Sequence, residues 1–128
     1  MYRPPSDTIK RFSLDLTQAA NTYDLCTATG GDVVIYLDRT AWYVDTAGTL
    51  FTDVAVQTDQ TTPNVLLTAG EGALANILAQ ATLAPANVTP FILKAGQKIQ
   101  YTITGAQGTG AVSVYFHYRP ASGGGHLA

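Results

Sequence analysis

The stretch that decides the fold is AVSVYFHYR, residues 111–119. Large apolar side chains stand at alternate positions, and polar or mixed side chains stand between them. Because successive side chains of a β-strand point to opposite faces, this alternation predicts a strand with one face toward a core. The inward face would hold Val112, Val114, Phe116 and Tyr118, and the outward face Ser113, Tyr115, His117 and Arg119. This is the longest strand that the pattern predicts.

Similar short runs, many with the same period of two, continue from this stretch back toward the start of the chain. Further strands are predicted at residues 12–16, 22–28, 32–38, 41–44, 52–58, 65–67, 91–93 and 98–104. Only a few polar residues separate 32–38 from 41–44, which predicts a hairpin between them. The glycine-rich residues 105–110 lie between two predicted strands and are typical of a hairpin loop.

These eight or nine short strands predict an all-β fold, an antiparallel β-sandwich of jelly-roll type with at most one short helix. Residues 70–84 are ambiguous. Leu74, Ile77 and Leu78 have helical spacing, but an irregular or extended crossing of the sandwich is equally open.

The domain organisation follows from composition and from the ends of the pattern. With 128 residues, 46% hydrophobic and 12% charged, the chain has the size and composition of one folded domain. The sandwich is expected to span residues 8–120. An extended arm, residues 1–7, would precede it, and a flexible Gly-rich tail, residues 121–128, would follow it.

Charge and hydropathy indicate neither a nucleic-acid partner nor a membrane. The net charge is −2 and the lysines and arginines are scattered, whereas polyanion binding requires them clustered. The N-terminus has no apolar signal region, and the most apolar stretch, residues 73–86, is too short to span a bilayer. We therefore expect a soluble protein made in a cytoplasm. Cys26 is the single cysteine, so we expect a buried or half-buried, unreactive thiol.

The sequence contains no constellation typical of catalysis, a cofactor or a metal. Residues 70–75, GEGALA, match the spacing of a dinucleotide-binding fingerprint, but that fingerprint needs a carboxylate about 20 residues later. No Asp or Glu follows Glu71. Ser113 and His117 share one strand face at a separation of about 13 Å, which is too far for a hydrogen bond. Two histidines and one cysteine are too few for a typical metal site. We expect no enzyme, no cofactor and no metal, although an oxygen-ligand calcium site in the polar region 53–64 stays open as an alternative.

Four aromatic residues could serve recognition. If Trp42, Tyr43, Tyr115 and Tyr118 gathered at the surface, they could stack on a sugar, but core or interface packing is the favoured interpretation. We name Trp42 and Tyr43 as candidate protein-contact residues.

Several segments resemble small all-β virion proteins of tailed bacteriophages, among them capsid decoration (cement) proteins. The resemblance is carried by TDQTTP (58–63), GALAN (72–76), AGQKIQYTI (95–103) and VYFHYRP (114–120). It implies a non-enzymatic virion protein on the capsid surface, trimeric and bound to the major capsid protein. The arm Tyr2, Arg3, Pro4, Pro5 would then act as a strap, because its prolines lower the entropy lost on ordering. The alternatives are a glycan- or receptor-binding module of a phage tail or fibre and, less in keeping with the sequence, a small sandwich hydrolase.

Overall fold

The computed structural model describes residues 7–128. The strands are β1 (Thr8–Asp15), β2 (Asn21–Thr29), β3 (Val33–Ile35), β4 (Ala41–Thr58), β5 (Val65–Leu67), β6 (Thr82–Leu83), β7 (Phe91–Leu93), β8 (Lys98–Pro120) and β9 (His126–Leu127), and the two 3-10 turns are η1 (Leu37–Arg39) and η2 (Leu74–Asn76). Every strand pairing is antiparallel, so the predicted all-β sandwich class is confirmed. Within residues 7–128, no helix has the length and apolar character needed to cross a membrane.

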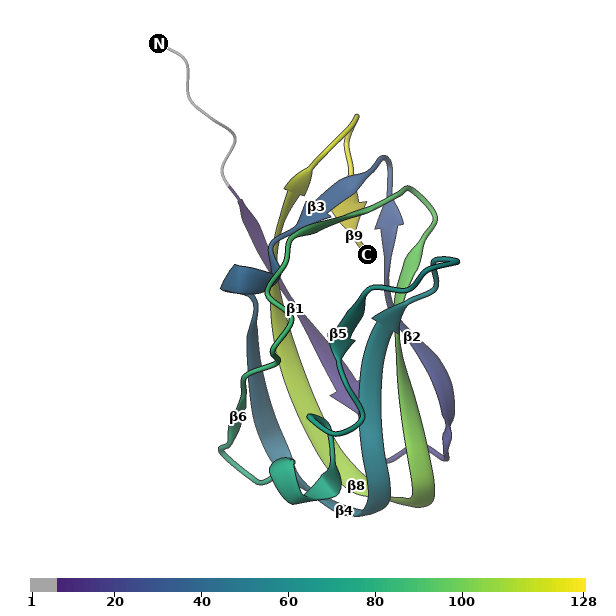
Figure 1. Cartoon of the computed structure of the whole chain (residues 1–128), viewed down its shortest axis with the longest axis vertical. Coiled ribbons are helices and arrows are strands. Elements are labelled where there is room, and N and C mark those ends of the chain that lie inside the picture. Colours follow the sequence, from purple (N-terminus) through teal and green to yellow (C-terminus); the bar gives the residue numbers. More distant parts are fainter. Residues whose placement is uncertain (1–6) are drawn as a thin grey trace.

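Two long bent strands organise the molecule. β4 has 18 residues and β8 has 23, much longer than the short strands predicted. The first half of β4 pairs with the second half of β8, with Trp42 opposite Val114. The second half of β4 pairs with the first half of β8, with Val54 opposite Ile103. Both strands turn at the lower end of Figure 1, so each runs down one layer of the sandwich and up the other.

The shorter strands extend the two layers. In one layer β5 lies beside β4, and β2 and β9 continue the sheet beyond β8. In the other, β1 pairs with β8 on one side and β6 pairs with β4 on the other, while β3 and β7 extend the sheet past the start of β4. The core lies between the layers.

The predicted hairpin loop at residues 105–110 is wrong. β8 stays one strand through these residues and its two halves pair with β4 instead of with each other, because β4 follows β8 around the bend. The glycines permit this close approach. A Cβ atom added to Gly108 would lie 1.6 Å from the carbonyl oxygen of Thr49, and Gly105 has a φ of +101°. These glycines carry one strand from layer to layer rather than closing a loop.

The predicted hairpin between residues 32–38 and 41–44 is also wrong. β3 covers only Val33–Ile35 and pairs with β7 and with the end of β8, so that Val34 lies opposite both Ile92 and Arg119. The turn η1 separates β3 from β4 and redirects the chain. β4 therefore begins beside the second half of β8, with Ala41 opposite Tyr115, rather than beside β3.

The core confirms the period-two predictions. Val112, Val114, Phe116 and Tyr118 are buried, as are Val54, Val56, Ile99, Tyr101 and Ile103. A bulge in β2 between Asp24 and Cys26 shifts the pairing with β8 and adds Cys26 to the buried set. Residues 70–84 form η2 and β6 rather than an α-helix, so the extended alternative holds; Ile77 is buried while Leu78 is exposed.

The C-terminal residues are part of the fold, which corrects the predicted flexible tail. β9 pairs with β2, Ala28 lying opposite Leu127. Leu127 is fully buried, and the backbone groups of Thr27 and Ala128 exchange hydrogen bonds of 2.8 and 3.0 Å. A buried leucine held by strand pairing makes residues 126–128 a structural element.

Candidate functional site

The predicted contact residues are of two kinds, those of the arm and the aromatic residues of β4. Tyr2, Arg3, Pro4 and Pro5 lie outside the described residues. Trp42 is only 4% exposed and packs its ring edge-on against Phe116, with 6.2 Å between ring centroids. It is a core residue, which corrects its choice as a contact residue.

Tyr43 is the predicted contact residue that reaches the surface. It is 45% exposed and lies on the face of β4 opposite to Trp42. The ring of Tyr115 lies 5.8 Å away at 82° to it. Because the two rings are nearly perpendicular, they form no flat platform of the kind that stacks on a sugar ring.

A polar cluster next to these tyrosines joins three strands. The Ser113 hydroxyl on β8 donates a hydrogen bond to the carboxylate of Asp45 on β4 and accepts one of 2.9 Å from Arg11 Nε on β1. Arg11 also forms an ion pair with Asp45 at 3.7 Å. Ser113 was expected to face outward and does lie on the outward face, but these two side chains cover it to 1% exposure. The contacts cross-link β1, β8 and β4, which is a structural role.

A second polar cluster fixes the start of the described chain. The Asp7 carboxylate accepts hydrogen bonds from Arg39, which ends η1, and from Arg119 Nε at 3.3 Å. Both guanidinium groups lie over the ring of Tyr36, 4.9 and 5.7 Å from its centroid. Asp7 is therefore anchored to the body, so the arm begins at a defined point of the surface.

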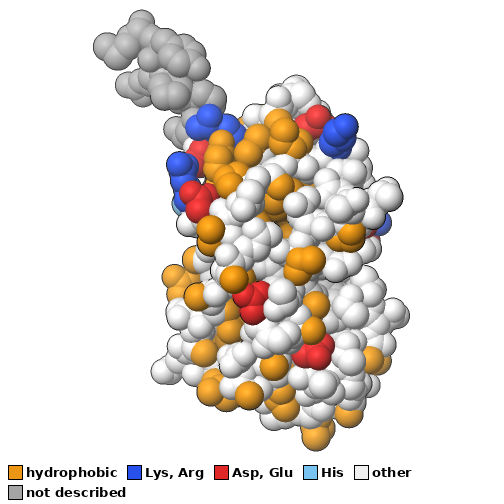
Figure 2. All heavy atoms as spheres, in the orientation of Figure 1, with side chains coloured by type: hydrophobic (Ala, Val, Ile, Leu, Met, Phe, Trp, Pro, Cys, Tyr) orange, Lys and Arg blue, Asp and Glu red, His pale blue; other side chains and the backbone are white. Residues whose placement is uncertain are grey.

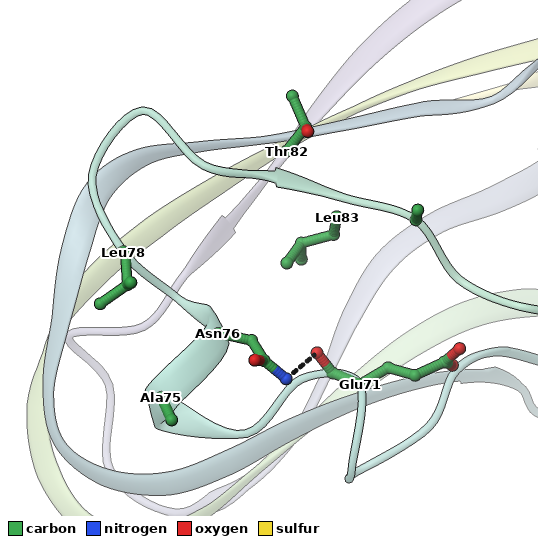
Figure 3. Close-up of a pocket in the computed structure, with 7 residues that line it drawn as sticks. Glu71, Ala75, Asn76, Leu78, Thr82 and Leu83 are labelled. Carbon is green, nitrogen blue, oxygen red and sulfur yellow. Dashed lines mark hydrogen bonds between the residues drawn. The ribbon is translucent and has the colours of Figure 1, made fainter.

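Two hollows lie beside residues 71–88. The larger, about 350 Å³, is lined by Glu71, Ala75, Asn76, Leu78, Thr82, Leu83 and Ala84. The smaller, about 230 Å³, shares Leu83 and Ala84 and reaches Trp42. Figure 3 shows the larger hollow between η2 and β6, with the Asn76 amide donating to the Glu71 backbone oxygen.

The Glu71 carboxylate holds the chain that follows β6. It accepts hydrogen bonds from the backbone N–H groups of Thr68 at 2.9 Å and Ala86 at 2.7 Å. These bonds, that from Thr68 first, lower the pKa of Glu71 below its ordinary value of 4.5. The carboxylate is thus occupied in pinning residues 82–88 across the edge of the sandwich, rather than offered to a ligand.

The described residues offer no prepared metal site or reactive thiol. No group of three His, Cys, Asp or Glu side chains within residues 7–128 is placed to hold a metal ion. Cys26 is buried as predicted, and desolvation raises the pKa of its thiol to about 12.

Sequence reasoning missed the exposed Leu50. It lies where β4 bends, is 70% exposed and has a φ of 71°. A leucine between Thr49 and Phe51 gives no local sign of either property, because the left-handed backbone is imposed by the neighbouring strand.

Comparisons with known proteins give no relative. The chain matches no family model, and no curated protein or solved structure shows significant similarity to it.

Proposed function

We propose that this chain is a non-enzymatic structural protein of a bacteriophage virion, which decorates the capsid through protein–protein contacts. The observation that carries the proposal is the anchoring of Asp7 by Arg39 and Arg119. An arm that straps onto a neighbouring protein transmits force to its domain only if its root is fixed. Here two arginines from different elements, stacked on Tyr36, supply that root.

The size of the arm suits such a strap. Residues 1–6 alone could span about 20 Å if fully extended, enough to reach a neighbouring protein. Its sequence includes Tyr2 and Arg3, residue types enriched at the energetic centres of protein interfaces. The body is weakly charged, at 12%, so that contact with a capsid protein requires little desolvation of ions.

The fold supports the proposal in a second way. β4 and β8 take part in both layers and so tie the two layers together along the chain, which suits a domain that bears load at a capsid surface. We propose the major capsid protein as the partner and a trimer at the symmetry axes of the head as the assembly. The glycan-binding alternative relied on four aromatic residues, of which only Tyr43 and Tyr115 lie on the outward face. Their rings are nearly perpendicular, so they offer no flat surface on which a sugar could stack.

The first test is whether the chain belongs to a particle. Phage particles purified by density gradient from cells that carry this gene should contain the chain, cross-linked to the major capsid protein. Gradient-pure heads without the chain would refute the proposal. A glycan array is the counter-test, since sugar binding that is lost in Tyr43→Ala would favour the alternative.

The second test concerns the arm. Deleting residues 1–6 while keeping Asp7 leaves the Arg39 and Arg119 bonds in place, so the thermal midpoint should not change. Occupancy of the truncated chain on heads should fall at least tenfold relative to the full chain. Tyr2→Ala with Arg3→Ala in the full-length chain separates side-chain contacts from arm length. Full occupancy after truncation would remove the strap from the proposal.

A further inference from the structure

The end of the sandwich at which β4 and β8 bend is built from uncharged segments. They are residues 16–20, 46–52, 72–82 and 105–110. Hydrogen bonds hold them together: Gly48 N donates to Ile77 O at 2.8 Å, and Gln107 Nε2 donates to Thr17 O at 2.9 Å. Figure 2 shows Lys and Arg gathered in the upper part of the visible face and only apolar and neutral polar side chains at the lower end. This surface can be covered without desolvating an ion.

Leu50 projects from this end on a strained backbone. Its φ of 71° lies in the left-handed region, which glycine, asparagine and aspartate adopt more readily than a branched apolar residue. The Thr49 and Thr109 hydroxyl groups bond at 2.7 Å on one side, and Phe51 is buried on the other. The Leu50 side chain itself is 70% exposed, so the fold gains little from it. A strained backbone that presents an exposed apolar side chain indicates that this side chain contacts a partner outside the single chain.

The same end also carries the larger hollow. The approach of Gly48 to η2 is so close that a Cβ atom added there would lie 2.9 Å from Leu74 Cδ1. Immediately beyond, Ala75, Leu78 and Leu83 line the hollow of about 350 Å³. Figure 3 shows Leu83 pointing from β6 toward η2. Glu71, the one charged lining residue, has its carboxylate bonded to Thr68 and Ala86.

We infer that this end is a self-association surface, in which Leu50 of one copy of the chain seats in the hollow of a second copy. A second copy is the occupant because one end supplies both the projecting leucine and a recess lined in part by Ala75, Leu78 and Leu83. The one charged lining residue, Glu71, has its carboxylate engaged by backbone N–H groups. When a projection and a recess share one surface, two copies can contact each other reciprocally, each giving its leucine to the other. This two-fold contact joins chains in pairs and is separate from the three-fold contacts of the proposed trimer. The bond between Thr49 and Thr109 holds Leu50 in place beforehand, which lowers the entropy lost on binding. This self-association involves copies of the chain alone and does not require that the chain belong to a virion.

The test is the mass of the full chain in solution without any capsid. The chain has a mass of 13.5 kDa, and sedimentation equilibrium over about 1–100 µM should show a multiple of it. Leu50→Asn keeps a similar size and suits the left-handed backbone, so it should fold at least as well while raising the dissociation constant at least tenfold. The matched control is Ile92→Asn on β7, 52% exposed and away from the uncharged end, which should leave association unchanged. A wild-type monomer at 100 µM, or association that ignores Leu50→Asn, overturns the inference.

A mixing experiment tests the reciprocal geometry. Ala75→Gln lengthens an exposed side chain that lines the hollow and should also weaken association tenfold. In an equimolar mixture, the Ala75→Gln copy still offers Leu50 and the Leu50→Asn copy still offers an open hollow. Mixed assemblies should therefore form more tightly than either variant alone, and failure to do so overturns the seating of Leu50 in this hollow. Monomeric chain that co-sediments with phosphatidylcholine vesicles through Leu50 would overturn it in favour of a membrane.

Discussion

Replacing Gly108 with alanine should destabilise the protein more than any other change of one methyl group at the bend. The added Cβ would lie 1.6 Å from Thr49 O and 2.7 Å from Thr49 C, both backbone atoms of the neighbouring strand. No side-chain rotation relieves this overlap, so β4 and β8 must separate by more than an ångström. Gly108 has no left-handed φ, which means that the penalty comes from the clash and not from alanine's own backbone preference.

The magnitude follows from what the separation breaks. Overpacking costs about 1–3 kcal/mol. Separating the strands also weakens the Thr49–Thr109 hydrogen bonds, at about 1 kcal/mol for each bond that is lost. With both bonds lost, the expected loss is about 3–5 kcal/mol, or about 10–20 °C in the midpoint for a domain of this size.

Urea unfolding followed by Trp42 fluorescence and by circular dichroism measures this loss. The control is Gly124→Ala, because a Cβ at Gly124 meets nothing within 4 Å and its φ is ordinary. That variant should stay within about 0.5 kcal/mol of the parent. If Gly108→Ala and Gly124→Ala prove equally stable, the close approach of β4 and β8 is wrong, and with it the account of the bend.

Three further predictions test other parts of the fold. Burial raises the pKa of the Cys26 thiol to about 12, so at pH 8 it should react with a maleimide only as fast as the protein unfolds. Prompt labelling of the native chain would show that β2 is not buried at Cys26. Glu71→Gln should cost about 1–2 kcal/mol at neutral pH. Since the folded pKa of Glu71 lies below 4.5, its contribution is complete above that pH and is lost as the pH falls through the folded pKa, so parent and variant should converge in acid denaturation curves. Leu127→Ala should destabilise by about 3 kcal/mol in thermal unfolding, whereas a loose tail would show no change.

The strand pattern was predictable because it is local. A strand with a core on one side buries alternate side chains, whichever strands lie beside it. Residues 111–119 follow this rule, so their burial could be predicted without knowing which strands pair with them. Trp42 could also have been placed from the sequence. It shares a face of β4 with the apolar Val44, whereas Tyr43 shares the opposite face with Asp45, and both Trp42 and Val44 are buried.

The pairing of strands was not predictable, because it depends on contacts far apart in the chain. Glycine suits a tight turn and a bent strand equally well, so residues 105–110 look the same in both arrangements. What distinguishes the two is β4, which places Phe51 opposite Gly105, a partner more than fifty residues away. The turn η1 and the strand β9 were missed for a related reason: each is stabilised by packing against distant strands rather than by its own residue preferences.

The bend of β4 and β8, which sequence reasoning did not find, also produces the proposed self-association surface. If residues 105–110 formed a hairpin loop, they would be exposed to solvent and would not pair with β4. The backbone of β4 near Leu50 would then have no neighbouring strand to fix its conformation. A bent pair of strands instead forces one residue of β4, Leu50, into a left-handed backbone opposite the glycine-rich part of β8. The same bend brings Gly48 against η2 and so sets the hollow beside the projecting leucine. Because one constraint produces both halves of the proposed contact, a change that straightens the bend should abolish self-association even where Leu50 itself is untouched.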